Sequence, residues 1–389
     1  MKKILLLLLF FTFISHAQWQ QTALTTGNVF SLAGNENYIF AGEWSLYVTT
    51  DNGGSWNVVG GVIIGGTHVS AVCVKDAYVF VTGIVLNRST NNGANWTQYN
   101  LSAADGFESL TASGNNVFVG THNYGIRRST NNGENWSVLT TGFPTVYSLA
   151  SNGDNIFAGV QNWGFYRSTN NGENWIQTLT GQRINALVNI NNIIYAGTDI
   201  NGVYISTDNG TSWAQTSLNN RKIRSLAMRG NNIFAGTDTS GVYISTNNGA
   251  SWVQKNEGLI NLRAESLLIS GNYVFAGTYG NGVWKRPLSE VIGILPISNE
   301  VPNQFFLSQN YPNPFNPNTV ISFQLAVNSF ATLKVYDILG REVATLVNEQ
   351  LQPGTYEVDW DGTNFPSGVY YYKMIADDFT ETKKMVLIK

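Results

Sequence analysis

Residues 245–252 read S-T-N-N-G-A-S-W, and variants of this eight-residue box recur through much of the chain. The earlier copies occupy residues 49–56, 89–96, 129–136, 168–175 and 206–213. Their closing tryptophans are separated by 40, 40, 39, 38 and 39 residues, and a period of this kind is typical of a structural repeat. This part of the chain therefore consists of copies of one folding unit.

Each box lies near the end of a unit of short strands, as the copy that starts at residue 223 illustrates. Residues 223–226 and 233–237 are apolar runs around the turn sequence R-G-N-N, and a loop leads to a third run at 242–245. The box then reverses the chain into a fourth run that begins at Trp252. Four short strands in about 40 residues are typical of one blade of a β-propeller.

The second strand of the unit recurs more often than the box. It starts at residues 39, 79, 117, 156, 194, 233 and 274. The last unit continues to Trp284 and then lacks a box, whereas W-Q-Q-T at 19–22 matches the strand after other boxes, such as W-I-Q-T at 175–178. Pairing the first and last segments would cover two open strand edges. We therefore predict an all-β fold in which residues 18–286 form a seven-bladed propeller that an N-terminal strand closes.

The residue types of the box predict a structural role. Its third residue offers a short side-chain oxygen that can accept hydrogen bonds from the amides of the turn, and the glycine two places later suits a positive φ. The closing tryptophan can bury a large ring against the neighbouring sheet. The acceptors are Asp51, Asn91, Asn131, Asn170, Asp208 and Asn247. The tryptophans are Trp56, Trp96, Trp136, Trp175, Trp213 and Trp252.

The boxes resemble those of the Asp-box, or bacterial neuraminidase repeat, family. In that family the box forms the turn between the third and fourth strands of each propeller blade, away from the central binding face. Asn replaces the acid in four of the six boxes of this chain, which keeps an acceptor and removes the charge. The resemblance therefore implies a structural turn and no chemistry at the box.

The N-terminus predicts export. Residues 1–17 begin with Lys2 and Lys3, continue with an apolar run and end in S-H-A, the pattern of a secretory signal peptide that is removed. The apolar run is too short to span a bilayer, so we expect no transmembrane anchor. Cys73 is the only cysteine, and its apolar neighbours favour a free structural thiol.

The C-terminal part of the chain has a different pattern. After a proline-containing linker at 287–303, residues 304–389 alternate polar and apolar residues in short runs that predict a small antiparallel sandwich. The stretches N-Y-P-N-P-F-N-P at 310–317, V-Y-D-I-L-G-R-E-V at 335–343 and K-K-M-V-L-I-K at 383–389 resemble the C-terminal sorting domain of type IX secretion cargo. The likeness is to the variant similar to the immunoglobulin-like domain of flagellar hook-capping proteins. It implies that type IX secretion machinery is the partner and that the protein is secreted or held at the outer cell surface.

Few residues suit catalysis or cofactor binding. After removal of the leader, His68 and His122 are the remaining histidines, too few for a multi-histidine metal site or for histidine-activated catalysis. We therefore expect no metal and no cofactor. The chain has 22 basic and 25 acidic residues and a formal net charge of −3, which does not suit a nucleic-acid partner.

Sialidases share the box, so a sialidase-like glycoside hydrolase is the alternative function. Resemblance to that family would imply an arginine triad, a tyrosine with a glutamate partner and an acid/base aspartate on the central face. The R-I-P sequence of that family near the first blade is absent. Arg183, Arg224 and Arg263 do recur near the start of the innermost strand of blades five to seven, and Tyr279 is predicted on the same face.

We expect a non-catalytic, monomeric binding module for a glycan or a protein. The loops between second and third strands, together with the connections between blades, should form one face of the propeller. Exposed aromatic and cationic side chains on such a face suit sugar stacking or protein contacts. The candidates are Trp44, Tyr124, Trp163 and Tyr279, with Arg183, Arg221, Lys222, Arg224 and Arg263.

Overall fold

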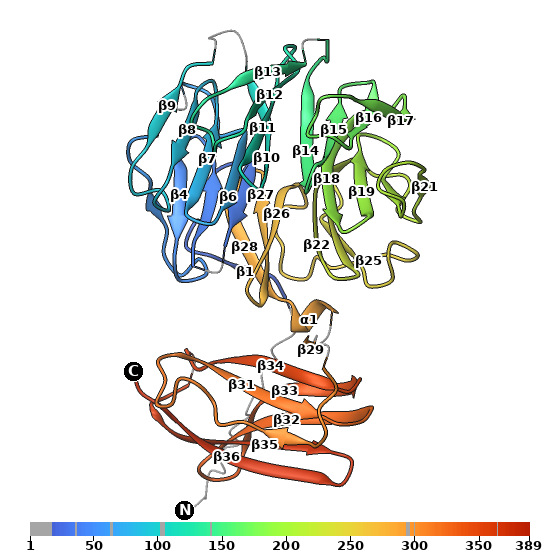
Figure 1. Ribbon diagram of the computed structural model, residues 1–389. Coiled ribbons are helices and arrows are strands. Elements are labelled where there is room, and N and C mark those ends of the chain that lie inside the picture. The colour runs from blue at the N-terminus through green and yellow to red at the C-terminus, as the bar shows by residue number, and fades with distance from the viewer. Residues whose placement is uncertain are drawn as a thin grey trace, which may run out of the picture.

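The computed structural model describes residues 18–35, 37–62, 65–101, 106–140, 142–292, 296–298, 300–363 and 365–389. The predicted signal peptide, residues 1–17, lies outside these ranges. The described residues form nine four-stranded antiparallel sheets, seven of them in the propeller region and two in the C-terminal region. Figure 1 shows the seven sheets around a common centre and the C-terminal region beside one edge of the ring.

The strands of each blade follow one another outwards from the centre. Blade 1 contains β2 (Ser31–Gly34), β3 (Ile39–Gly42), β4 (Leu46–Thr49) and β5 (Asn57–Val58). Blade 2 contains β6 (Ala71–Lys75), β7 (Tyr78–Thr82), β8 (Leu86–Ser89) and β9 (Thr97–Tyr99). Blade 3 contains β10 (Phe107–Ser113), β11 (Asn116–Thr121), β12 (Ile126–Ser129) and β13 (Ser137–Thr140). Blade 4 contains β14 (Val146–Asn152), β15 (Asn155–Val160), β16 (Gly164–Ser168) and β17 (Ile176–Thr180).

The remaining blades repeat this order until the last. Blade 5 contains β18 (Ile184–Ile190), β19 (Ile193–Thr198), β20 (Val203–Ser206) and β21 (Ala214–Gln215). Blade 6 contains β22 (Ile223–Arg229), β23 (Asn232–Thr237), β24 (Val242–Ser245) and β25 (Val253–Gln254). Blade 7 contains β26 (Ala264–Ser270), β27 (Tyr273–Thr278), β28 (Val283–Pro287) and β1 (Gln20–Gln21). The first strands of successive blades contact one another, and β26 contacts β2, so the sheets form a closed ring.

The N-terminal strand closes the ring, as predicted from the sequence. In the antiparallel pair of β1 and β28, Gln20 lies opposite Lys285 and Gln21 opposite Trp284. Trp19 is only 2 % exposed, and its Nε1 donates a hydrogen bond of 2.7 Å to the carbonyl of Lys255. The two ends of the propeller therefore complete one sheet, in which β1 covers the edge of β28.

Each box is held by two side chains. The Ser245 hydroxyl accepts a hydrogen bond of 2.8 Å from the amide of Gly249 and donates one of 2.9 Å to Asn247 Oδ1. Asn247 Oδ1 in turn accepts one of 2.9 Å from the amide of Ser251. Gly249 has a φ of +83°, as predicted, and Asn248 before it has a φ of +56°, which was not predicted. Asn tolerates this region better than other non-glycine residues.

The box tryptophans pack against the preceding blade, which confirms their predicted role. All six are half-buried, and each contacts a hydrophobic cluster of its own. Trp213 of blade 5, for example, lies edge-on to Phe165 of blade 4, with 4.6 Å between the ring centroids. The box thus fastens one blade to the next.

Two boxes carry an acid, and the pKa of that acid is lowered in both. The hydroxyl and amide of Ser212 donate to Asp208 and hold its pKa well below the usual range. Burial of Asp51 opposes such a shift, but hydrogen bonds from Thr49 and Ser55 outweigh it and lower the pKa. A lowered folded-state pKa stabilises the fold above the pKa of an unfolded Asp, about 4, and this contribution is lost as the pH falls toward the folded-state value.

We therefore expect the double variant Asp51→Asn/Asp208→Asn to lose less stability in acid than the unmodified protein. Asn keeps the acceptor oxygen, as Asn247 shows by making the same contact to a following amide, but it does not titrate. The melting temperature, measured between about pH 5 and pH 2, should fall less steeply in the variant. Parallel curves would show that these two carboxylates do not contribute to acid sensitivity.

Close approach between blades depends on small residues that the sequence patterns did not single out. The Ser266 hydroxyl donates a hydrogen bond of 2.9 Å to the carbonyl of Val29 across the seam between blades 7 and 1. At the same seam, a Cβ on Gly277 would lie 2.6 Å from Val29 Cγ1, which is closer than two carbon atoms can pack. Ser109, Ser148 and Ser225 make equivalent hydrogen bonds to their next blades.

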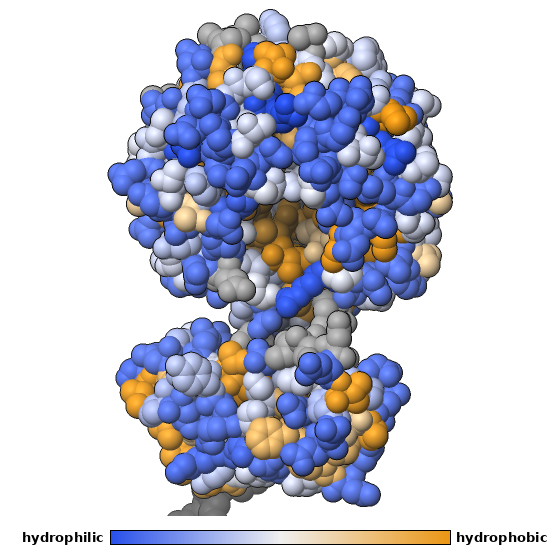
Figure 2. Space-filling model, viewed as in Figure 1, coloured by the Kyte–Doolittle hydropathy of each residue, from blue (hydrophilic) through white to orange (hydrophobic). Residues whose placement is uncertain are grey.

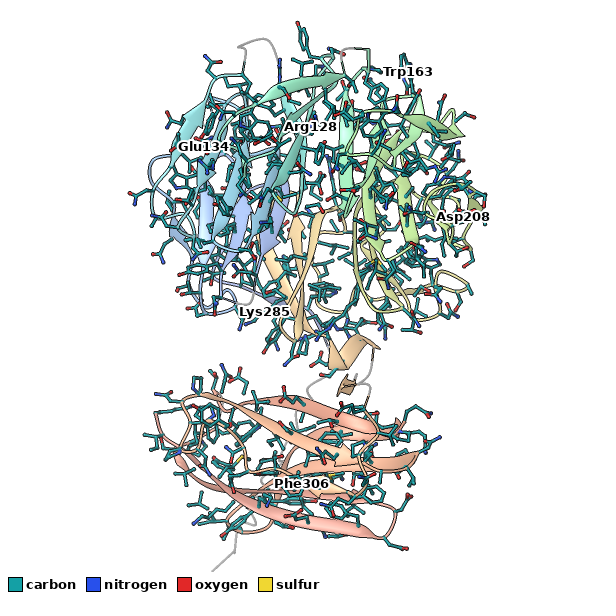
Figure 3. All side chains as sticks on the ribbon, in the orientation of Figure 1. Arg128, Glu134, Trp163, Asp208, Lys285 and Phe306 are labelled. Atoms are coloured by element: carbon teal, nitrogen blue, oxygen red, sulfur yellow. The ribbon has the colours of Figure 1, made fainter. Side chains whose placement is uncertain are left out.

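The C-terminal region is the predicted sandwich. One sheet has the order β29 (Pro296–Ser298), β34 (Gly354–Asp361), β31 (Asn318–Leu325) and β30 (Phe306–Leu307). The other has the order β33 (Glu342–Leu351), β32 (Ser329–Asp337), β35 (Gly368–Ala376) and β36 (Phe379–Leu387). Their facing side chains form one core that includes Phe323, Tyr356, Trp360 and Tyr372. Phe306, labelled in Figure 3, lies in the short strand β30.

The segment predicted as a linker, residues 287–303, contains regular structure that the prediction missed. Pro287 still pairs with Tyr273 as the last residue of β28, and helix α1 (Ser289–Ile292) follows directly. Leu288 is 5 % exposed in the core of blades 6 and 7. Strand β29 already belongs to the sandwich. The prolines suggested a linker, but Leu288 and Val291 pack on blades 6 and 7, and β29 pairs with β34 of the sandwich.

The single cysteine is a free thiol, as expected. Burial raises the pKa of Cys73 to about 12, so the group stays protonated at neutral pH and is a poor nucleophile.

Candidate functional site

The loops and the boxes lie at opposite ends of the strands. Because the strands of a blade are antiparallel, the loop between second and third strands lies at the same end as the connection from the previous blade. Backbone hydrogen bonds of 3.1 Å join the two in blades 5, 6 and 7: the amides of Asp199, Asp238 and Tyr279 donate to the carbonyls of Arg183, Lys222 and Arg263. We call the surface made by these loops and connections the loop face. Figure 3 labels Trp163 in such a loop and Asp208 in a box.

A β-bulge occurs at the same place in the innermost strands of blades 3 to 7. The strand register skips one residue directly after the first, buried residue of the strand. A bulge re-aims the side chain of the extra residue, here at the end of the strand that forms the loop face. The bulged residues are Glu108, Tyr147, Asn185, Arg224 and Glu265. Phe30 and Ser70 hold the same place in blades 1 and 2, and we call these seven positions the bulge ring.

The residue type differs among the seven positions of the bulge ring, whereas the positions directly before and after them repeat from blade to blade. The residue after each bulge position is always Ser or Ala, because it packs against the next blade. The residue before it is always apolar and buried. At the bulge positions themselves, only Glu occurs more than once. The repeat therefore does not determine these side chains. The ring surrounds the centre of the propeller, where Figure 2 shows a hollow with hydrophobic residues on its wall.

A network of alternating charges crosses the loop face over blades 5 to 7. Arg224 donates to Asp238 Oδ1 from Nε at 2.8 Å and from Nη2 at 2.6 Å. Arg263 Nε lies 3.5 Å from the same oxygen and also donates to Glu265. Beside them, Lys222 Nζ lies 3.0 Å from Asp199 Oδ1. Each of these acids therefore already has a cationic partner.

Arg183 lies apart from the other two predicted arginines. Its guanidinium stacks on Tyr147 at 4.0 Å from the ring centroid, and its Nε donates to Asn185 Oδ1 at 3.0 Å. The structure thus brings Arg224 and Arg263 together around Asp238 but directs Arg183 elsewhere. The three predicted arginines share a face and do not form a triad around one point.

The four predicted aromatic residues are all exposed on the loop face. The exposed fractions are 59 % for Trp44, 46 % for Tyr124, 44 % for Trp163 and 42 % for Tyr279. Trp163 lies edge-on to Phe143, with 6.4 Å between centroids. The guanidinium of Arg263 lies over the Tyr279 ring, 4.2 Å from the ring centroid. These side chains are therefore available to a ligand, with their orientations partly fixed by neighbours.

Glu108 and His122 form a second titratable cluster that was not predicted. Glu108 Oε1 lies 3.6 Å from His122 Nδ1, which is also 3.1 Å from the Thr145 hydroxyl. Burial raises the pKa of Glu108, although His122, His68 and Arg183 act in the opposite direction. Glu108 holds the position in blade 3 that Arg224 holds in blade 6, so an alignment of the inner strands identifies it as a counterpart of Arg224.

The described residues contain no group of three His, Cys, Asp or Glu side chains placed to hold a metal ion. Within the part of the chain that the structure covers, no helix is both long and apolar enough to span a membrane.

Comparison with known families identifies the C-terminal domain. Residues 309–389 match the family model of the secretion system C-terminal sorting domain. The chain therefore carries a C-terminal domain of the kind that marks proteins for type IX export to the cell surface or for secretion. No curated protein sequence matches the chain.

Several solved structures are similar to this chain. One is PorZ of Porphyromonas gingivalis, an essential bacterial surface component of the type IX secretion system, with 13 % identity and a TM-score of 0.57 over 93 % of this chain and 60 % of PorZ. YCF48 from Cyanidioschyzon merolae has 19 % identity and a TM-score of 0.55 over 70 % of this chain and 98 % of YCF48. A GH74 xyloglucanase from Xanthomonas campestris has 14 % identity and a TM-score of 0.56 over 79 % of this chain and 59 % of the enzyme. These likenesses concern the fold alone, and the chain spans about three fifths of the length of PorZ.

Proposed function

We propose that this exported propeller is a monomeric, non-catalytic binding module that recognises a glycan or a protein through its loop face. The observation that carries the proposal is the bulge ring, where side chains differ from blade to blade while the positions on either side repeat. Exposed aromatic residues lie in loops of the same face. A surface with diverse polar groups and accessible aromatic rings suits selective recognition.

A sialidase-like hydrolase remains the alternative, and the charge network argues against it. Arg224 and Arg263 are already paired with Asp238 and Glu265, so a substrate carboxylate would have to displace these partners. Burial raises the pKa of two acids on this face, Glu43 and Glu108, and each is a candidate acid/base group. Paired-carboxylate hydrolysis needs two acids side by side, but among the described residues Glu108 faces His122 and Glu43 is hydrogen-bonded to Tyr47.

Related folds are compatible with ligands of both kinds. YCF48 has been solved bound to a D1 peptide, with 16 % identity and a TM-score of 0.56 to this chain. The GH74 neighbour is named as a xyloglucanase. At such low identity these names indicate only that a propeller of this shape can serve either a peptide or a polysaccharide.

The test is to measure binding and hydrolysis with one preparation of the exported chain. Immobilised sialosides, β-glucans and peptides report binding, and release of reducing ends or of sialic acid reports hydrolysis. We expect binding without turnover above the buffer control. Turnover that disappears in Glu108→Gln and persists in Asp208→Asn, a box variant, would instead establish a hydrolase.

A further inference from the structure

The connection between blades 1 and 2 is the longest in the propeller, one residue longer than the connection from Trp252 to Ala264 between blades 6 and 7. Thirteen residues separate the positions of Trp56 and Val69, whereas nine separate Trp175 and Ile184 at the corresponding connection between blades 4 and 5. It also contains two glycine pairs, at 60–61 and 65–66. Nothing in the blade architecture requires this longer segment, since blades 4 and 5 join with a shorter one.

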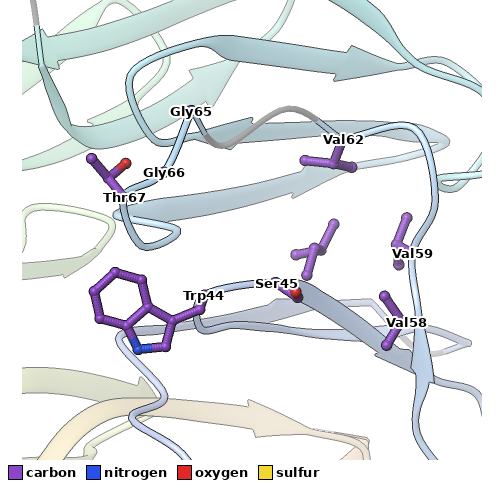
Figure 4. Close-up of a pocket in the computed structure, with 9 residues that line it drawn as sticks. Trp44, Ser45, Val58, Val59, Val62, Gly65, Gly66 and Thr67 are labelled. Atoms are coloured by element: carbon purple, nitrogen blue, oxygen red, sulfur yellow. The ribbon is translucent and has the colours of Figure 1, made fainter.

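A cavity of about 320 Å³ lies beneath this connection. Its described lining includes Trp44 and Ser45 from the loop between β3 and β4, Val58 and Val59 from the end of blade 1, and Thr67 from the connection. Figure 4 shows Trp44 at one end of the cavity and the valines at the other. Leu46, only 1 % exposed, contributes to the same lining. The volume falls at the lower end of the range for small-ligand sites.

Trp44 has the properties of a stacking platform. Its side chain is 59 % exposed although it borders the cavity. His68 supports it edge-on, with 6.1 Å between ring centroids and 83° between planes. His68 is itself held by Phe30, at 4.2 Å between centroids. An aromatic ring fixed in this way loses little conformational entropy when a ligand stacks on it.

The lining chemistry selects among ligands. None of its described residues is ionisable, so an anionic or cationic group would enter without a partner and lose its hydration. The polar groups available are hydroxyls and backbone amides. A Cβ on Gly66 would have no other atom within 4 Å, so the space beside this residue is open. An apolar ring face beside neutral hydrogen-bonding groups matches a sugar, which has C–H groups on one face and hydroxyls around its edge.

We propose that this cavity binds one neutral sugar unit of a glycan, with the apolar face of the sugar on the Trp44 indole. The proposal rests on the binding function of the loop face and narrows its ligand to an uncharged glycan.

The experiment uses the full chain and titrates it with short cello-, manno- and galacto-oligosaccharides, sialosides and peptides. Trp44→Ala should weaken the preferred neutral oligosaccharide roughly 30-fold, as loss of an aromatic hot spot does, and Trp44→Phe should restore part of the affinity. Phe306→Ala, which removes an aromatic ring that is 44 % exposed on the C-terminal sandwich and lies outside the loop face, is the matched control. Both alanine variants should have the same melting temperature as the unmodified protein, because the rings that they remove are exposed.

The outcomes separate this proposal from the proposed function. If neutral oligosaccharides bind equally well to Trp44→Ala, the cavity is not the sugar site although the loop face is a binding surface. If only sialosides or peptides bind, the ligand class is wrong and the binding function stands. If no glycan or peptide binds, both the ligand class and the binding function fail.

Discussion

Trp19→Ala should lower the melting temperature by roughly 10 °C. The Trp19 ring is almost fully buried in a cluster with Leu259 and Trp284, and removal of such a ring costs about 3–5 kcal/mol. Its Nε1 also donates to the carbonyl of Lys255, which is 236 positions away in the sequence. The substitution therefore weakens the junction that joins the two ends of the propeller.

A matched tryptophan separates this effect from a general loss of aromatic area. Trp163→Ala removes a ring that is 44 % exposed, and we expect its cost to stay below about 0.5–1 kcal/mol. Trp19→Phe should recover most of the packing without the Nε1 hydrogen bond. Differential scanning calorimetry of the three variants is the measurement, and equal melting temperatures for Trp19→Ala and Trp163→Ala would contradict closure by β1.

Arg286→Ala should have the next largest effect and lower the free energy of unfolding by about 3 kcal/mol. Arg286 pairs with Val274 in blade 7 as Ser245 pairs with Ile233 in blade 6, so it stands where a box would begin. Its side chain is 2 % exposed, and its Nη1 lies 2.7 Å from Glu257 Oε2. Breaking a buried pair costs about 3–5 kcal/mol, and the low end applies because Glu257 is 55 % exposed.

The same ion pair makes the stability of the protein depend on pH. The hydrogen bond from Arg286 lowers the pKa of Glu257 from its usual 4.5. The contribution of the pair to stability is thus complete above this value and is lost as the pH falls toward the folded-state pKa. The difference in stability between the unmodified protein and Arg286→Ala should shrink in acid.

A double-mutant cycle with Glu257→Gln isolates the ion pair from the packing of the Arg286 stem. Urea denaturation of both single variants and the double variant gives the coupling free energy. Arg286→Met, which keeps most of the volume, serves as the packing control. Additive effects at neutral pH would show that the pair itself does not stabilise blade 7.

The repeat explains why much of the fold could be predicted. Because the units can be compared with one another, Trp19 was recognised as a displaced copy of the strand that normally follows a box, such as the one after Trp175. The positive φ of Gly249 followed from its place in the turn. Each of these inferences uses a local pattern that occurs several times in one chain.

The site was predicted only in outline, because its contacts are specific to single blades. The sequence placed Arg224 and Arg263 on the correct face. Their acidic partners could not be assigned, since Asp238 reaches both arginines only after blades 6 and 7 have packed together. The bulge ring was missed because a bulge has no distinctive residue type. The cavity beside Trp44 depends on the path of the connection that follows Trp56, which its glycine pairs do not specify.

Hydrogen exchange of the exported chain, with and without the oligosaccharide or peptide that gives the strongest binding signal, tests the central claim most directly. If the loop face holds the ligand, exchange should slow in the loops around Trp44, Tyr124, Trp163 and Tyr279 and in the connections that precede the inner strands. The boxes, such as residues 206–213, should exchange at unchanged rates. Protection confined to the boxes, with none in the loops, would contradict the assignment of binding to the loop face.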